Sequence, residues 1–485
     1  MSGTGRTALA AAAAFGLPLA LYASTAAPTV YGVDSAELTT GAYLLGIVHP
    51  PGSPAYLLIG HVFTWLPIGD VGFRLNLLSA VSAAACCLLL FDVILHLTAQ
   101  RGIALSSSLV AAATYSLWSS AVAAEVYALQ GACLLALVAL GLRWRGSGRR
   151  ATLIGLAWLA GISLGVHLAA VLLLPGLAIL LFAPPRPASR RAAPLVAAAL
   201  AFLSGAAVYL YLPLRHLAAL PLDPARDYWR IDLATWSGFW WMVSGGGFRR
   251  LFFAVPWPAV PAGLMHLAFW LWSNFLGFGA LVGVLGLLAG LRRAPAVHAG
   301  LSLMGLGHLA FFVRYGAGDR DMMNLPVLLL WAIWIGVGAA TIARRLRSRR
   351  DAAAGRLAVE VGLVSLAALL LAVNRPWVDL HTDRSARERG VALLAALDPQ
   401  AVLVGSWPDL RLVEYLQQVE GQRPDVQPVD AFFATPAERA ARIAAGLASG
   451  RPVYVSTCRD LPDARLTCEP VAGCDCFRLR SPARE

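Results

Sequence analysis

Apolar windows of about 18 to 22 residues recur along most of this chain, and each is long enough to cross roughly 30 Å of hydrocarbon as an α-helix. Of the 485 residues, 58% are hydrophobic and only 14% are charged, a balance too apolar for a water-soluble protein of this length. We therefore predict an integral membrane protein whose all-α membrane part has about eleven spans. These spans are expected near residues 7–27, 75–98, 104–122, 124–142, 151–166, 168–183, 192–212, 262–291, 296–313, 323–343 and 357–374.

Arginine supplies all the basic side chains, and in the membrane part these cluster in short loops between the predicted spans. A net charge of +12 would suggest nucleic acid as a partner of a soluble protein, but this loop pattern argues against any nucleic-acid partner. The positive-inside rule places the clusters at 143–150, 184–191, 291–293 and 344–356 in the cytoplasm. The N-terminus is then inside and the C-terminus outside. A cleaved signal peptide ending near "STAAP" is the alternative for the first span.

The composition becomes polar after residue 374, which divides the chain into a transmembrane part, 1–374, and an external part, 375–485. The external part is predicted to be a small α/β domain. Its strands are expected near 401–406, 424–430 and 451–457, and its helices near 384–397, 408–420 and 436–449. The arginine-only, alanine-rich composition is typical of a GC-rich bacterium, so the expected location is a bacterial inner or plasma membrane.

Four of the seven cysteines lie in the external part, namely Cys458, Cys468, Cys474 and Cys476. An oxidising exterior favours disulfides among them, with three connectivities open. A zinc site is the lesser alternative because paired CxxC knuckles are missing. Within the membrane part, the apolar segment 55–67 is too short to span and is expected to lie along the interface.

Polar residues that the apolar chain does not require accumulate on the predicted outer side. A charge at the hydrocarbon centre costs roughly 2.5 to 3.5 kcal/mol, which explains why such groups lie near interfaces but not why they share one face. An external active site explains the shared face. The candidate residues are Asp34, Glu37, His49, Glu125, Tyr127, His167, Arg215, Trp236, Arg314 and Asp319.

Several of the candidates also have a structural alternative. Asp34 in "DSAE" can act as the N-cap of a helix over 35–47, and this would still leave one carboxylate oxygen for catalysis. Glu125 can be a solvated loop residue, and His167 can be a histidine satisfied within a turn. Trp236 can belong to an aromatic belt at the interface. A divalent cation stays open, because Asp319 and its neighbour Asp321 can ligate one or pair with Arg320.

Several segments resemble a known family. They are "VDSAELTTGAYLLGIVHPPGSPAYLLIG", "FRLNLLSA", "AEVYALQ", "GVHLAAVLLLP", "YLPLR", "TWSGFWWMVS" and "EYLQQVEGQRPDV". They are similar to a polytopic membrane family, long catalogued as a domain of unknown function, whose animal member is the transmembrane protein 260 type of protein O-mannosyltransferase. Two positions depart from the family pattern. Val33 stands where the family usually has glycine, and Ser53 stands where it has an aromatic residue.

The resemblance implies a GT-C glycosyltransferase, which uses a sugar linked to a lipid phosphate and has an acidic catalytic residue in its first external loop. Asp34 matches that acidic position and Glu37 follows it. Independently, a carboxylate can take the proton of an acceptor hydroxyl while the sugar passes through an oxocarbenium-like state. The leaving polyprenyl phosphate needs a cation, and we assign that role to Arg215, with Arg314 as the alternative.

The remaining candidates are expected to orient the sugar, the acceptor or a metal ion. The expected partners are therefore a polyprenyl-phosphate-sugar donor, membrane lipids, and an acceptor that is a protein, a glycan or a lipid. The sugar is a hexose, with mannose and a protein acceptor implied by the resemblance alone. A multi-span transporter or lipid flippase is the main competing function, and it would place ionisable residues near the bilayer midplane. An inert scaffold is a further alternative.

Overall fold

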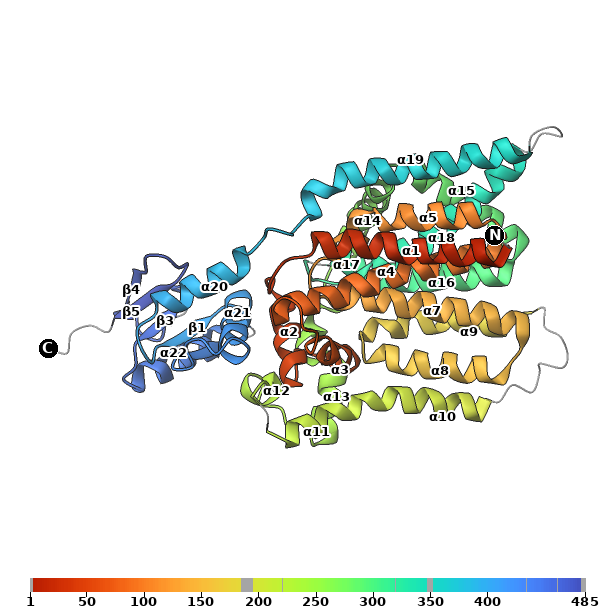
Figure 1. Ribbon diagram of the computed structural model, residues 1–485. Coiled ribbons are helices and arrows are strands. Elements are labelled where there is room, and N and C mark those ends of the chain that lie inside the picture. The colour runs from red at the N-terminus through yellow and green to blue at the C-terminus, as the bar shows by residue number, and fades with distance from the viewer. Residues whose placement is uncertain are drawn as a thin grey trace.

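The computed structural model describes residues 3–184, 195–219, 221–318, 320–346, 352–432, 434–459 and 461–480. A helical body is followed by a small α/β domain at one end of it (Figure 1). Within the described residues, seven helical segments are long and apolar enough to cross a membrane. They are α1 (Gly3–Thr25), α4 (Val71–Thr98), α7 (Val126–Ser147), α10 (Leu195–Ala206) continued by η3 (Ala207–Leu210) and α11 (Tyr211–Leu217), α16 (Pro295–Phe312), α18 (Leu325–Arg345) and α19 (Ala352–Val378).

The span predicted over 262–291 is not one continuous helix, because the chain breaks in its middle. α14 (Val260–Asn274), preceded by η5 (Trp257–Ala259), meets α15 (Phe278–Arg293) at an angle of 106°. Leu276 and Gly277 have φ values of 48° and 68° at the break, a left-handed backbone that a helix cannot contain. A Cβ on Gly277 would lie 2.3 Å from the Trp272 ring, so the bend also requires a residue without a side chain.

Three other predicted spans are shorter apolar helices, so the count of eleven is not confirmed. They are α5 (Arg101–Ala112), α8 (Arg150–Leu164), and η1 (Leu168–Leu173) with α9 (Leu174–Phe182). The interfacial segment forms α3 (Pro54–Phe63). The remaining short helices are α2 (Asp34–Leu44), α6 (Tyr115–Ser119), α12 (Pro224–Asp227), α13 (Trp236–Val243), η4 (Gly246–Leu251) and α17 (Arg320–Met323).

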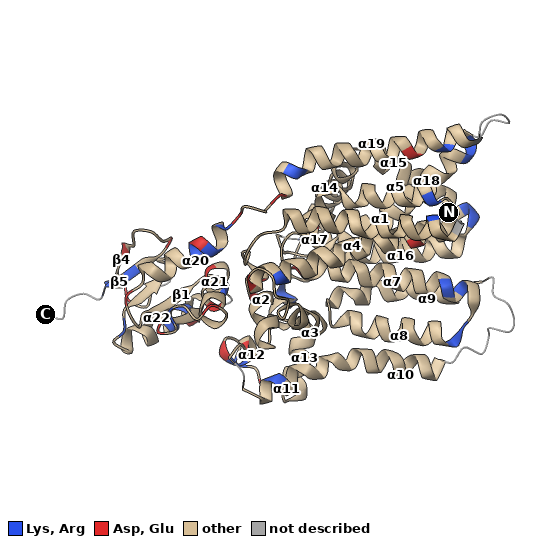
Figure 2. Ribbon diagram, in the orientation of Figure 1, with Lys and Arg blue, Asp and Glu red and all other residues tan. Residues whose placement is uncertain are grey.

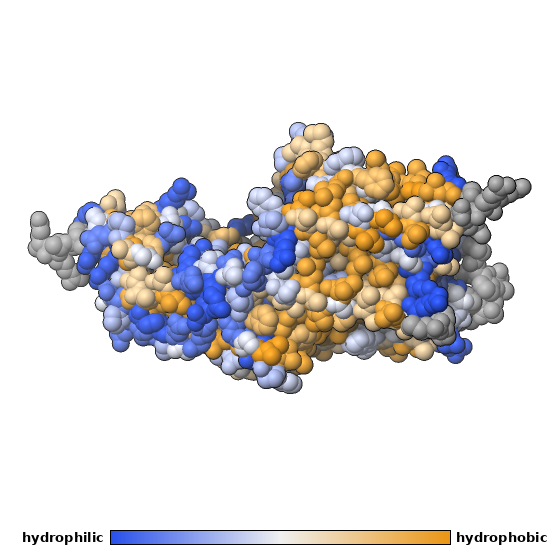
Figure 3. Space-filling view, turned by 45° about the horizontal axis from the view of Figure 1, so that its top comes forward, coloured by the Kyte–Doolittle hydropathy of each residue, from blue (hydrophilic) through white to orange (hydrophobic). Residues whose placement is uncertain are grey.

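The charged residues of the helical body lie mostly toward its two ends (Figure 2). The arginines at the α7–α8 and α15–α16 turns and at the C-terminal end of α18 lie at the end where the chain starts, opposite the α/β domain (Figure 2). Apolar side chains cover the surface between the two ends (Figure 3). The arrangement is that of an integral membrane protein with an apolar belt between polar ends.

The C-terminal domain is a five-stranded mixed sheet in the order β2-β1-β3-β5-β4. β1 pairs in parallel with β2 and β3, and β5 pairs antiparallel with β3 and β4. The three predicted strands are present, and β4 and β5 were not expected. The elements are α20 (Ser385–Ala396), β1 (Val402–Gly405), α21 (Trp407–Gln418), β2 (Gln427–Asp430), α22 (Pro436–Ala448), β3 (Val453–Val455), β4 (Thr467–Pro470) and β5 (Phe477–Arg480).

The predicted disulfides of this domain are confirmed. Cys458 pairs with Cys468, and Cys474 pairs with Cys476. The first bond joins the loop after β3 to β4, and the second lies within the turn between β4 and β5. All four cysteines are thereby used, so the alternative of a zinc site is wrong.

Candidate active site

The loop between α1 and α2 is held against the N-terminal end of α4. The side chain of Asn76 donates to the carbonyl oxygens of Ala27 and Thr29, at 2.8 and 2.9 Å. A Cβ at Gly72 would lie 2.1 Å from the Val30 nitrogen, so the loop backbone lies directly on this glycine. α4 therefore fixes the position from which α2 starts.

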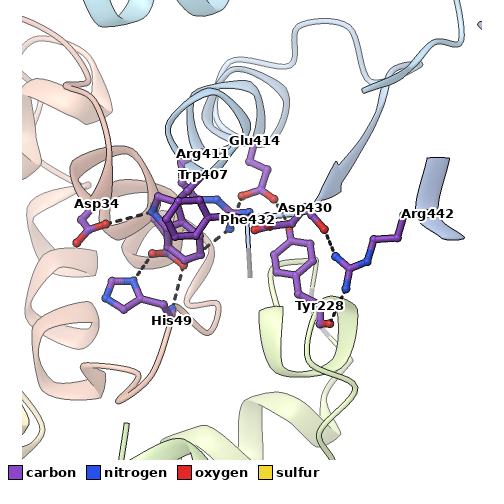
Figure 4. Close-up of polar contacts among 10 residues, drawn as sticks. Asp34, His49, Tyr228, Trp407, Arg411, Glu414, Asp430, Phe432 and Arg442 are labelled. Carbon is purple, nitrogen blue, oxygen red and sulfur yellow. Dashed lines mark hydrogen bonds and ion pairs between the residues drawn. The ribbon is translucent and has the colours of Figure 1, made fainter. Parts of the chain in front are cut away.

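Asp34 is the first residue of α2 and is not its N-cap, so that expectation is corrected. The N-cap position is Val33, which makes no side-chain capping bond and has φ 56°. Positive φ is unfavourable for a β-branched residue and easy for glycine, the residue that the family usually has here. Because Asp34 does not cap its own helix, its carboxylate faces the cavity described below and the C-terminal domain (Figure 4).

Glu37 and His49 form a buried ion pair behind Asp34. The Glu37 side chain is fully buried. Its Oε1 accepts the backbone N–H of His49 at 2.9 Å, and its Oε2 accepts the His49 Nδ1–H at 2.5 Å. Burial on its own lowers the pKa of His49, but the Glu37 carboxylate and then Asp34 outweigh it and raise the pKa to about 9. His49 is therefore an imidazolium at neutral pH.

The loop that carries His49 is held by α11. The Tyr211 hydroxyl donates to the Gly46 carbonyl at 2.7 Å, and Arg215 donates to the carbonyls of Leu45 and Leu44 at 2.6 and 3.1 Å. Arg215 thus binds the C-terminal end of α2, where a helix leaves carbonyl oxygens unsatisfied. The predicted role of Arg215 as the phosphate-binding cation is corrected, because the guanidinium is committed to these carbonyls and does not line the cavity.

Asp34 and His49 open into a cavity of about 240 Å³. Three more predicted residues line it, namely Glu125, Tyr127 and His167. His167 also accepts the Ala169 N–H through Nδ1 at 3.2 Å, so it has the turn role considered for it as well as a place in the cavity. The rest of the wall is mostly apolar and is formed by Phe248, Phe252, Phe311, Phe312, Tyr315 and Met323, among others.

The other predicted residues lie elsewhere. Trp236 is 78% exposed and stacks on Trp240, as expected of an aromatic belt. Arg314 donates to the carbonyls of Val255 and Phe253 and lies 4.2 Å from the centre of the Trp257 ring. Neither residue lines the cavity, which corrects both expectations.

Of the two aspartates considered for a cation, Asp319 lies outside the described residues. Asp321 pairs with the ring of His266 at 2.8 Å. Asp321 therefore contacts α14 and does not make the pairing with Arg320 that the sequence suggested.

The cluster that sequence reasoning missed comes from the C-terminal domain (Figure 4). Arg411 of α21 is fully buried, and its Nη1 lies 3.8 Å from Glu37 Oε1 and 2.9 Å from Glu414 Oε2. Its Nη2 lies 3.0 Å from Asp430 Oδ2. Burial opposes the charge of Arg411, but these three carboxylates raise its pKa above the ordinary value. We refer to Glu37, Arg411, Glu414 and Asp430 as the interdomain cluster.

Aromatic rings enclose the Arg411 guanidinium on two sides. The ring centres of Trp407 and Tyr228 lie 4.6 and 4.9 Å from it. Tyr228, the residue that follows α12, donates its hydroxyl to Glu414, and burial raises the pKa of Glu414 to about 7 against the effect of Arg411. Trp407 also donates its indole N–H to Asp34 Oδ1 at 3.2 Å, and its ring lies 5.5 Å from that of His49. The C-terminal domain thus contacts both acidic residues of α2.

Asp34, Glu37 and His49 are also suitable in type and distance to hold a metal ion, with one donor atom of each within 4.8 Å of the others. Both Glu37 oxygens, however, already accept hydrogen bonds from His49, and Arg411 lies beside one of them. A divalent cation would compete with the imidazolium proton and face the guanidinium. These three side chains therefore suit a histidine–carboxylate ion pair better than a metal site.

Comparison with known proteins supports the expected family. Residues 34–189 match the family model described as the N-terminal domain of the protein O-mannosyl-transferase TMEM260. Over 237 residues the chain is 28% identical to protein O-mannosyl-transferase TMEM260 of Mus musculus, which covers 47% of this chain and 32% of the mouse protein. The chain therefore spans about a third of the length of this curated relative.

Solved structures show the same fold at low identity. ArnT from Cupriavidus metallidurans bound to undecaprenyl phosphate aligns with a TM-score of 0.59 at 12% identity, over 99% of this chain and 98% of ArnT. The Archaeoglobus fulgidus oligosaccharyltransferase in complex with Zn and sulfate aligns with a TM-score of 0.53 at 11% identity, over 94% and 68%. Over residues 34–189 the chain is thus similar to the N-terminal domain of the protein O-mannosyl-transferase TMEM260, and as a whole it shares its fold with ArnT and the archaeal oligosaccharyltransferase.

Proposed function

We propose that the chain is a membrane glycosyltransferase that moves a hexose from a polyprenyl-phosphate donor to an acceptor hydroxyl, with Asp34 as the general base. The observation that carries the proposal is that Asp34 lines a largely apolar cavity beside the His49–Glu37 ion pair. A negative group and a positive group thereby face the same space. The O-mannosyltransferase relative supports mannose as the sugar, and the fold shared with ArnT supports a lipid phosphate as its carrier.

The proposed reaction is a single displacement. Asp34 takes the proton of the acceptor hydroxyl, and the acceptor oxygen bonds to the anomeric carbon of the sugar. The bond between that carbon and the phosphate oxygen breaks, and its electron pair stays on the phosphate. The configuration at the anomeric carbon is therefore inverted, and Asp34 keeps the proton until the products leave.

His49 takes the role that the sequence suggested for Arg215. The histidine side chain is 20% exposed and lines the cavity, while Nδ1 is bound to Glu37. The imidazolium can thus compensate the negative charge that grows on the leaving phosphate oxygen, in a place with little water. Among the described residues that line the cavity, His49 and His167 are the only basic ones. The phenylalanines of the wall suit the prenyl chain next to the phosphate.

A reconstituted assay tests the function. Protein in lipid nanodiscs is expected to transfer mannose to a serine- or threonine-containing peptide from a polyprenyl-phosphate-mannose donor and not from a nucleotide sugar. Mass spectrometry would measure the added hexose, and nuclear magnetic resonance would report the inverted linkage. Transfer from the nucleotide sugar, or movement of the lipid between leaflets without transfer, would contradict the proposal, and the second outcome would favour a flippase.

The orientation of the chain is part of the proposal. Two disulfides in the C-terminal domain and arginine clusters at the opposite end both support an external C-terminal domain and a cytoplasmic N-terminus. After mild reduction of intact cells, a membrane-impermeant maleimide is expected to label Cys458 and Cys468. Cys86 and Cys87 are buried and serve as the internal control. Labelling that requires permeabilised cells would reverse the orientation.

A further inference from the structure

The C-terminal domain docks on the membrane part with the carboxyl edge of its parallel strands. Arg411 belongs to α21, which starts two residues after β1 ends, and Asp430 is the last residue of β2. Doubly wound α/β domains bind their ligands at this edge, where the strand order reverses. Here α21 packs on α2, the helix that carries Asp34 and Glu37. The edge at which such domains usually bind a ligand therefore packs against α2.

The buried charges of this contact depend on one another. Glu37 and Arg411 have fully buried side chains, and Glu414 and Asp430 are nearly buried. Arg411 is the one cation within 4 Å of all three carboxylates among the described residues. A buried carboxylate without a nearby cation tends to take up a proton, because burial disfavours its charged form. Without Arg411 this would apply to Glu414, whereas Glu37 would keep the His49 imidazolium but lose the cation that lies 3.8 Å away on its other side.

We propose that Arg411 is a positioning residue, supplied by the C-terminal domain, that holds Glu37 in place and thereby orients the His49 imidazolium toward the donor phosphate. The expected effect on the rate rests on the proposed function. The expected effect on the position of Glu37 rests on geometry alone. Arg411 does not line the cavity, and its guanidinium lies 3.8 Å from Glu37 Oε1, so we expect it to act through Glu37. The membrane part accordingly lacks a complete site until α21 lies on α2.

Hydrogen exchange tests the structural part without any need for activity. The backbone N–H of His49 donates to Glu37, so its exchange rate reports whether Glu37 keeps its place. In full-length Arg411→Gln, exchange in the peptide that contains His49 is expected to rise at least about tenfold. Arg387→Gln is the matched control, because Arg387 binds Glu420 within the same domain, at 2.6 Å, away from α2. Unchanged exchange at His49 in Arg411→Gln would overturn the proposal.

A double-mutant cycle tests the catalytic part. Arg411→Gln is expected to lower kcat about tenfold while the KM for the lipid donor changes less than about twofold, and to cause no further loss when Glu37→Gln is already present. If Arg411→Gln lowers kcat by the same factor in the wild-type protein and in Glu37→Gln, Arg411 does not act through Glu37. That result would overturn the proposal. If Arg411→Gln does not insert in the membrane, Arg411→Lys takes its place in the cycle. Lysine keeps the positive charge but lacks the planar guanidinium group. Failure of the wild-type protein to transfer sugar would refute the proposed function, whereas the exchange result would still decide the role of Arg411.

Discussion

Replacement of Asp34 with asparagine is expected to abolish sugar transfer while the protein stays folded and inserted in the membrane. Asparagine keeps a carbonyl oxygen that can accept the indole N–H of Trp407, the contact that Asp34 makes at 3.2 Å. It cannot take the acceptor proton. A general base contributes typically about 10² to 10⁴ in rate, so we expect kcat to fall at least about 10³-fold. The measurement is the initial rate of product formation in nanodiscs at saturating lipid donor.

Asp92→Asn is the matched control for this substitution. Asp92 pairs with Arg143 at 2.8 Å, near the C-terminal ends of α4 and α7. Its removal is expected to leave kcat within about twofold, since an exposed ion pair contributes little. Full activity of Asp34→Asn would remove Asp34 as the base and leave Glu125 as the next carboxylate of the cavity to test.

His49→Gln is expected to lower kcat about 10²-fold, because one group that stabilises the leaving phosphate is lost. It should also change the pH dependence. Glu37 raises the pKa of His49 to about 9, so the wild-type rate is expected to fall as the pH rises through about 9. The glutamine variant has no such proton to lose, and its slower rate should not show this alkaline fall. The measurement is kcat between pH 6 and 10.

The same ion pair should affect stability in a defined direction. The pKa of His49 is higher in the folded protein than the ordinary value of 6.5. Protonation therefore favours the folded state, and this contribution is fully present below about pH 6.5 and lost as the pH rises through about 9.

His381→Gln is a suitable control, because that exposed histidine pairs with Asp379 outside the cavity. An alkaline fall of the rate that persists unchanged in His49→Gln would assign the titration to another group.

The part of the site that lies close together in sequence was predictable. Asp34, Glu37 and His49 interrupt an apolar chain within 16 positions, and such groups are costly unless they have a function. Glu125 and His167 followed from counting spans, since both were expected at helix ends on the same side. These inferences needed only residue types and the alternation of topology.

Contacts across the chain were not predictable from the same signals. Arg411 lies on an amphipathic helix, where an arginine is ordinarily exposed, and its buried partners are set by docking rather than by periodicity. Glu414 lay within a segment that resembled the family, but nothing in that segment indicated its contact. Arg215 was misassigned because a guanidinium at a helix end suits carbonyl oxygens as well as phosphate. The bend at Gly277 was missed because hydropathy measures composition and not direction.

The contact between Asp34 and Trp407 joins residues 373 positions apart, and this has a consequence for biosynthesis. A ribosome makes α2 near the start of translation and α21 only in the last fifth of the chain. Throughout that interval Glu37 lacks the Arg411 guanidinium, and His49 is its remaining charged partner. If the chain has the proposed function and Arg411 the proposed role, a nascent chain can have its membrane helices in place and still be inactive until the C-terminal domain has folded onto α2.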